Sequence, residues 1–160
     1  MPEITIRQLD EQPTVVMRTI VPVESIPAFL EKAFTAVAEH IGAHDADFAG
    51  PPFARYLPVS DDFRAFEIEA GFPVASAIPG EGEIEASTLP GGEAATVTHI
   101  GPYAGMRPTY EAITDWLGAH QATPSGAPWE VYLSDPVDEP DPASWRTDIV
   151  QPYQEMAHAR

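Results

Sequence analysis

The chain has 160 residues, of which 25 are acidic and 8 basic, giving a formal net charge of −17. Clustered Lys and Arg are therefore absent, which argues against direct binding to nucleic-acid phosphates, and the lack of cysteine excludes disulfides and Cys-based metal sites. No apolar run reaches the roughly 18–20 residues of a membrane span, and the N-terminus lacks the pattern of a secretory signal. We expect a cytoplasmic protein with no membrane contact.

The hydropathy pattern predicts eight strands and two helices, separated by turn signals. In chain order the strands are Glu3–Leu9, Thr14–Val21, Phe53–Pro58, Arg64–Gly71, Glu83–Leu89, Ala94–Ile100, Trp129–Leu133 and Arg146–Val150. One helix follows the second strand, with apolar residues at helical spacing up to Ile41, Ser25 as its N-cap and Gly42 at its end. The other precedes Gly118, and an acidic, proline-rich stretch from Asp135 to Ala143 predicts an exposed loop.

The strongest signal is an internal repeat with an offset of 76 residues, the separation of His44 and His120. The same offset places GPPFARYL on GAPWEVYL and Phe34 on Tyr110. We therefore predict an α+β fold of two β-β-α-β-β halves, about 1–76 and 77–155, within a single domain spanning 1–160. The sheet should be mainly antiparallel, with a ligand cleft where the halves meet at a pseudo-two-fold axis.

One position breaks the repeat, because Ala54 of the first half corresponds to Glu130 of the second. Strand alternation separates Glu130 and Tyr132 from Trp129 and Val131, and we expect the latter pair to lie beneath the helix. Glu130 would then face the cleft. If it is buried there, its pKa should rise, and the carboxylate can attract a cation, orient water or act as a general base.

Two other candidate residues, Tyr103 and His99, lie just before the second predicted helix. Gly101 and Pro102 set a turn that aims Tyr103 toward the helix N-terminus, where it either lines the cleft or packs as a staple. His99 lies on a strand and is interpreted as a hydrogen-bonded structural histidine. The histidines and the acidic loop lack the spacing of a metal site, and no phosphate-binding or dinucleotide motif occurs, so we expect no metal and no cofactor.

The ordered segments THIGPY-x-x-M, WEVYLSDP and W-x-TDIVQPY resemble the GyrI-like small-molecule-binding family, which is also the effector-binding domain of multidrug-responsive transcription regulators. The resemblance extends from Ile4 to Tyr153. It implies two modules around a hydrophobic cleft, with Glu130 facing lipophilic cations beside Tyr132. It further suggests an aromatic lining by the ligand-binding candidates Tyr103, Tyr56, Phe72 and Trp145, of which the last two are placed only by their neighbouring strands.

We expect a stand-alone chain without a helix-turn-helix segment before Ile4, and for such a chain the family resemblance leaves three functions open. The first is binding of a hydrophobic or cationic aromatic small molecule. The second is hydrolysis of cyclopropane-type electrophilic genotoxins, with Glu130 positioning water and Tyr103 as a further catalytic candidate. The third is interaction with a protein partner such as DNA gyrase.

Overall fold

The computed structural model describes residues 4–58, 64–101, 107–133 and 141–155. It has two α-helices and nine strands in the described residues, and the strand pairs within each unit are antiparallel, in agreement with the predicted α+β fold. The elements are β1 (Thr5–Leu9), β2 (Gln12–Pro22), η1 (Val23–Ser25), α1 (Ile26–Ala43), β3 (Phe53–Pro58), β4 (Ala65–Pro73), β5 (Ile84–Leu89), β6 (Gly92–Ile100), α2 (Arg107–Ala119), β7 (Ala122–Pro124), β8 (Trp129–Tyr132), η3 (Pro142–Ser144) and β9 (Arg146–Glu155).

The chain forms two compact units, which are described separately. Unit 2 comprises Glu11–Pro90, and unit 1 comprises Gly91–Arg160 together with Met1–Asp10. The strand β1 belongs to unit 1 because it pairs with β6 along its whole length. The sequence-based prediction assigned this strand to the first half, because pairing between segments about 90 residues apart leaves no local signal in the sequence. The 76-residue repeat itself stays a prediction.

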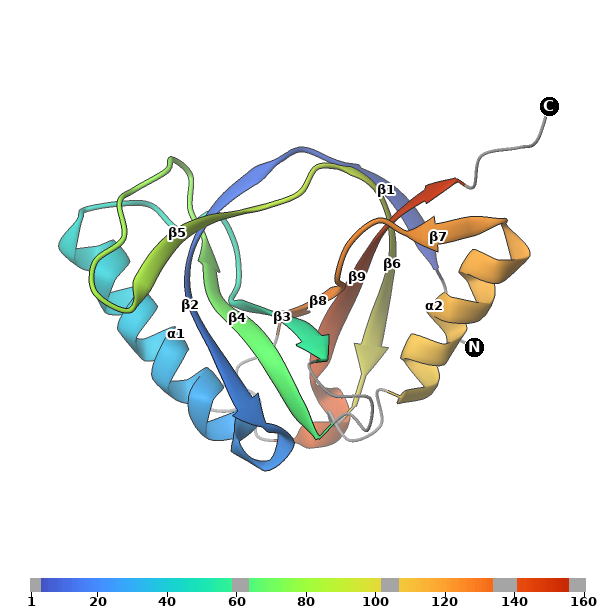
Figure 1. Cartoon of the computed structure of the whole chain (residues 1–160), viewed down its shortest axis with the longest axis horizontal. Coiled ribbons are helices and arrows are strands. Elements are labelled where there is room, and N and C mark those ends of the chain that lie inside the picture. Colours follow the sequence, from blue (N-terminus) through green and yellow to red (C-terminus); the bar gives the residue numbers. More distant parts are fainter. Residues whose placement is uncertain (1–3, 59–63, 102–106, 134–140, 156–160) are drawn as a thin grey trace. The chain divides into compact units, whose positions relative to one another are not determined.

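Unit 2 has the strand order β5-β2-β4-β3, and α1 lies along β2 and β4 (Figure 1). The buried face of α1 carries Phe29, Ala33, Val37 and Ile41, in agreement with the predicted apolar stripe. Phe72 of β4 lies on this helix face, because its ring is 6.0 Å from that of Phe34 on α1. Gly71 allows a close approach of β2, since a Cβ there would lie 1.9 Å from the carbonyl oxygen of Val15.

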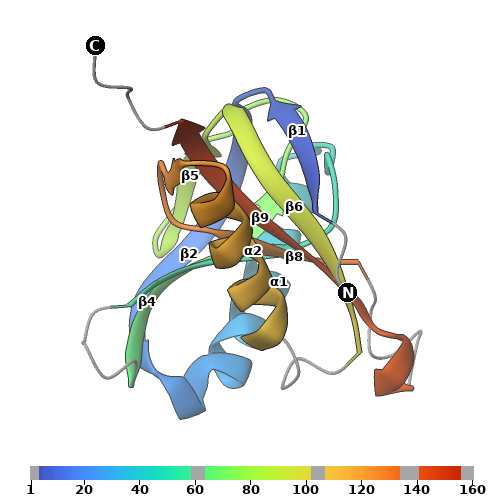
Figure 2. The same cartoon turned by 90° about the vertical axis from the view of Figure 1, so that its right-hand side faces the viewer.

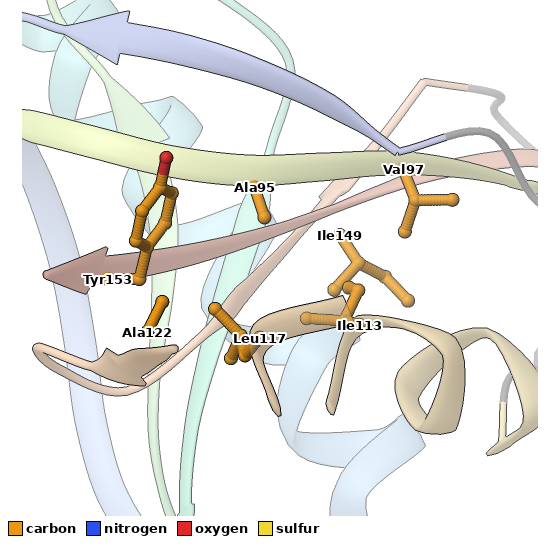
Figure 3. Packing of buried hydrophobic residues seen from close by; sticks show 7 residues of the cluster. All are labelled: Ala95, Val97, Ile113, Leu117, Ala122, Ile149 and Tyr153. Atoms are coloured by element: carbon orange, nitrogen blue, oxygen red, sulfur yellow. The ribbon is translucent and has the colours of Figure 1, made fainter. Parts of the chain in front are cut away.

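Unit 1 has the corresponding strand order β1-β6-β9-β8, with the short strand β7 also paired to β9. Figure 2 shows α2 lying over these strands. In Figure 3, Ile113 and Leu117 of α2 point toward Ile149 of β9 and Val97 of β6. Burial of these side chains holds α2 against one face of the strands. A residue that lies directly opposite Ile149 on a neighbouring strand therefore points to the same face.

The two helices end in the same way, one residue beyond the glycines expected to stop them. His44 Nδ1 lies 2.9 Å from the carbonyl oxygen of His40, and His120 Nδ1 lies 2.8 Å from that of Trp116. The next residues, Asp45 and Gln121, have positive φ angles of 51° and 54°. The residues compared in all three pairs are 76 positions apart, which is the offset of the predicted repeat. Gly42 and Gly118 lie inside the helices, and the left-handed residue that ends each helix is not a glycine.

No helix in the described part of the chain is long and apolar enough to cross a membrane.

Candidate functional site

Glu130 of β8 lies on the α2 face of unit 1, which corrects the sequence interpretation of this strand. In the antiparallel pairing of β8 with β9, Glu130 is opposite Ile149, which packs against α2. Trp129 and Val131 therefore lie on the face away from the helix. Period-2 alternation correctly separated these two sets, but it does not say which set a helix covers.

Two tyrosine hydroxyls hold the carboxylate of Glu130. Tyr132 lies two positions farther along the same strand and donates to Glu130 Oε1 at 2.8 Å. Tyr110 of α2 donates to Oε2. The two donors occupy one lone pair on each oxygen, which fixes the orientation of the carboxylate and leaves acceptor capacity on both oxygens.

Burial raises the pKa of Glu130 above its ordinary value, because the charged form loses hydration. The hydrogen bonds from Tyr110 and Tyr132, and the nearby His99, act in the opposite direction and favour the carboxylate. Desolvation is the largest of these effects. Burial thus favours the neutral form of this carboxyl group, and its hydrogen bonds favour the charged form. A cation bound beside it would stabilise the charged form strongly.

Two further polar side chains share the α2 face next to Glu130. His99 of β6 lies opposite Thr147 of β9, and Thr147 lies opposite Tyr132 of β8. His99 Nδ1 is 3.2 Å from the hydroxyl oxygen of Thr109 on α2, which agrees with its interpretation as a hydrogen-bonded structural histidine. The candidate site thus combines one carboxylate, two phenols and a row of small polar groups.

Tyr110 was not predicted as a site residue, although the repeat contained a signal for it. The 76-residue offset maps Phe34 onto Tyr110, and it maps Ala54 onto Glu130. Unit 1 therefore gains a hydroxyl on its helix where it gains a carboxylate on its strand. Comparing the two halves position by position would have identified the pair, whereas helical spacing alone assigned Tyr110 to the core.

The other predicted lining residues belong to both units and are described within each unit. In unit 2, Tyr56 and Phe72 lie on the α1 face, where Tyr56 packs edge-on against Phe66 with ring centroids 6.1 Å apart. In unit 1, Trp145 is partly buried just before β9, and its carbonyl oxygen accepts a 2.8 Å hydrogen bond from Gly101. Tyr103 lies outside the described residues. Within the described part of unit 1, the structure brings together Glu130 and Tyr132.

Unit 2 has a separate open pocket of about 610 Å³ between α1 and β2. Phe29 and Met17 contribute apolar surface to it, and Lys32 and Glu83 form an ion pair across its lining at 3.8 Å. Its carboxylates, Glu83 and Glu85, are exposed, unlike that of Glu130. Among the described residues, no three His, Asp or Glu side chains are grouped so that they could hold a metal ion.

The model of the GyrI-like small-molecule-binding domain matches residues 2–154. The chain belongs to the GyrI-like family. A comparison with curated protein sequences gave no match to this GyrI-like chain.

Solved structures share the fold of this GyrI-like domain at low sequence identity. The crystal structure of the EcmrR C-terminal domain has a TM-score of 0.86 at 21% identity, covering 98% of this chain and 99% of that one. In the longer EcmrR chain of a DNA complex, the match covers 97% of this chain but only 58% of that one, with a TM-score of 0.84 and 21% identity.

Two more distant structures carry chemical information about their own proteins. SAV2435 bound to tetraphenylphosphonium has a TM-score of 0.61 at 12% identity, covering 95% of this chain and 94% of that one. A hydrolase from Listeria innocua has a TM-score of 0.64 at 11% identity, covering 95% and 92%. At these identities the similarity establishes the GyrI-like fold and no more.

Proposed function

We propose that this GyrI-like domain binds a lipophilic cation, whose charge lies against the carboxylate of Glu130. The observation that carries the proposal is the pair of hydrogen bonds from Tyr110 and Tyr132 to the two oxygens of a partly buried carboxyl group. A carboxylate removed from water gains more from a cation than an exposed one does, because the local dielectric is lower. Family membership and the tetraphenylphosphonium bound to SAV2435 also support this proposal.

The tyrosines contribute to such a site in two ways. Their hydroxyls orient the carboxylate, and their rings offer apolar surface and an electron-rich face to a cation. Burial of the apolar part of the ligand would supply most of the affinity, while Glu130 would select for positive charge. The share of Tyr56, Phe72, Trp145 and Tyr103 in ligand binding stays a prediction from the sequence.

The direct test uses ligands of the same shape and opposite charge. Isothermal titration calorimetry with tetraphenylphosphonium and tetraphenylborate should give binding of the cation only. Glu130→Gln should lower the affinity for the cation by about tenfold to hundredfold, which is the value of a close interaction with a charged group. Glu93→Gln removes one exposed carboxylate from β6 and is the charge-matched control, with unchanged affinity. Equal binding of both ions, or an equal loss in both variants, would contradict the proposal.

The same geometry supports hydrolysis of a strained electrophile as a second candidate. Glu130 would take a proton from water as the water oxygen bonds to a ring carbon of a cyclopropane, while a tyrosine hydroxyl donates to the electron pair released when the carbon–carbon bond breaks. The specific observation is a carboxyl group with a raised pKa beside two phenols. Product beyond one equivalent of protein, dependent on Glu130, would establish catalysis; stoichiometric binding without product would exclude it for that substrate.

A further inference from the structure

Thr147 carries a buried hydroxyl that has no hydrogen-bond partner within the described structure. The residue is 0% exposed, and Oγ1 makes no hydrogen bond. Buried hydroxyl groups are nearly always paired with protein or an ordered water. An unpaired one therefore marks a place where a partner from outside the protein can bind.

The strand register places this hydroxyl beside the candidate site. Thr147 is opposite Tyr132 on β8 and opposite His99 on β6, and it lies two residues before Ile149, the partner of Glu130. Thr147 and Glu130 are thus diagonal neighbours on the same face, whose Cβ atoms are normally about 7–8 Å apart. Both side chains project toward the α2 side of unit 1.

These groups together are rich in acceptors. Each oxygen of Glu130 accepts one hydrogen bond from a tyrosine and keeps a further lone pair, and the lone pairs of Thr147 Oγ1 are unused. One nitrogen can bridge two such acceptors when it carries two hydrogens, because each N–H···O contact spans roughly 2.7–3.2 Å. A quaternary cation has no N–H and can offer only its charge.

We propose that Glu130 and Thr147 form a subsite for a primary or secondary ammonium group, which donates one hydrogen bond to the carboxylate and one to Thr147 Oγ1. The inference rests on the proposed binding of a cation at Glu130 and names the class of cation. It separates this chain's preferred ligands from permanently charged cations without N–H donors. The apolar substituents of the amine would lie against the rings of Tyr110 and Tyr132.

The test compares dibenzylammonium with dibenzyldimethylammonium, which share charge and aromatic groups but differ in N–H donors. We expect calorimetry near neutral pH to show more than about tenfold tighter binding of dibenzylammonium by the wild type, because the quaternary ion makes neither hydrogen bond. Thr147→Val removes the hydroxyl and keeps the shape, and should reduce this preference by about tenfold, the value of one hydrogen bond to a charged donor, without weakening binding of the quaternary ion. Thr147→Ser keeps the hydroxyl and should retain the preference.

Thr14 provides a matched control, since its hydroxyl is also buried and unpaired but belongs to β2 in unit 2. Thr14→Val should leave the preference for dibenzylammonium unchanged. A wild-type ratio near one would overturn the subsite while leaving cation binding intact. A preference that is undiminished in Thr147→Val would also overturn it, because Thr147 would then make no hydrogen bond to the ammonium. If neither cation binds, the proposed function itself fails.

Discussion

The hydroxyl of Tyr132 donates to Glu130 Oε1 at 2.8 Å, from a residue two positions along the same strand. Such a contact depends only on the pleat of β8, which turns both side chains to one face. The second donor, Tyr110, comes from α2 and therefore depends on how the helix packs. The carboxylate of Glu130 is thus fixed by one local and one tertiary hydrogen bond.

Removing either hydroxyl should raise the pKa of Glu130 further. Burial already raises this pKa, and the hydrogen bonds from Tyr110 and Tyr132 counteract the increase. In Tyr110→Phe or Tyr132→Phe the carboxylate loses a donor that favours its charged form. A carbon-13 NMR titration of the Glu130 carboxyl group measures the change directly. A fall in the pKa of Glu130 in either variant would refute the assignment.

The pH dependence of stability should carry the signature of Glu130. Because its folded-state pKa lies above the ordinary value of 4.5, the folded protein holds this proton more tightly than the unfolded chain. The stabilisation is complete below pH 4.5 and is lost as the pH rises through the folded-state pKa. Glu130→Gln stays neutral, so the free energy of unfolding of the wild type should fall relative to this variant over that window.

Urea unfolding at a series of pH values measures this difference, and subtraction removes the contributions of the other carboxylates. Glu93→Gln is again the charge-matched control for the general effect of removing one negative charge. A difference between wild type and Glu130→Gln that stays constant, or that increases in favour of the wild type with rising pH, would show that Glu130 is not desolvated.

The unpaired hydroxyl of Thr147 should lower stability in the absence of ligand. Burying a hydroxyl without a partner costs about 1–3 kcal/mol. Thr147→Val should therefore increase the free energy of unfolding by about 1–2 kcal/mol, and Thr14→Val should act in the same direction. Chemical denaturation at constant pH tests both. Destabilisation by Thr147→Val would mean that the hydroxyl is bonded to an ordered water in solution.

The positive φ angles of Asp45 and Gln121 offer a test of the helix ends. A left-handed conformation costs a non-glycine residue about 1–2 kcal/mol, partly offset by the greater chain entropy of glycine in the unfolded state. Asp45→Gly and Gln121→Gly should each stabilise the protein by about 0.5–1 kcal/mol in thermal or urea unfolding. Glu39→Gly, at an exposed position inside α1, should instead cost about 1 kcal/mol. Loss of stability in both cap variants would contradict the observed geometry.

Much of the fold was predictable because its signals are local. Both helices and eight of the nine strands followed from periodicity, and β7 was missed because its three residues are too few to show a pattern. The helices ran past Gly42 and Gly118, since a glycine permits a helix end without imposing one. The pairing of β1 with β6 depends on contacts between distant segments, which one sequence does not encode in any local motif.

The candidate site was predictable only in part. Glu130 was identified because it departs from the repeat, and Tyr132 because alternation places it on the same face. The side of the strand on which they lie was predicted wrongly, since only the pairing with Ile149 and the packing of α2 decide it. Tyr110 and Thr147 were missed for a related reason: an apolar pattern and an ordinary strand threonine acquire chemical meaning only when their neighbours are known.

The carbon-13 NMR titration of Glu130 in the presence of saturating tetraphenylphosphonium tests the central claim most directly. A cation bound against the carboxylate stabilises its charged form, so the pKa of Glu130 should fall on binding. A Glu130 titration that is identical with and without the bound cation would contradict the account, because it would place the ligand's charge away from this carboxylate.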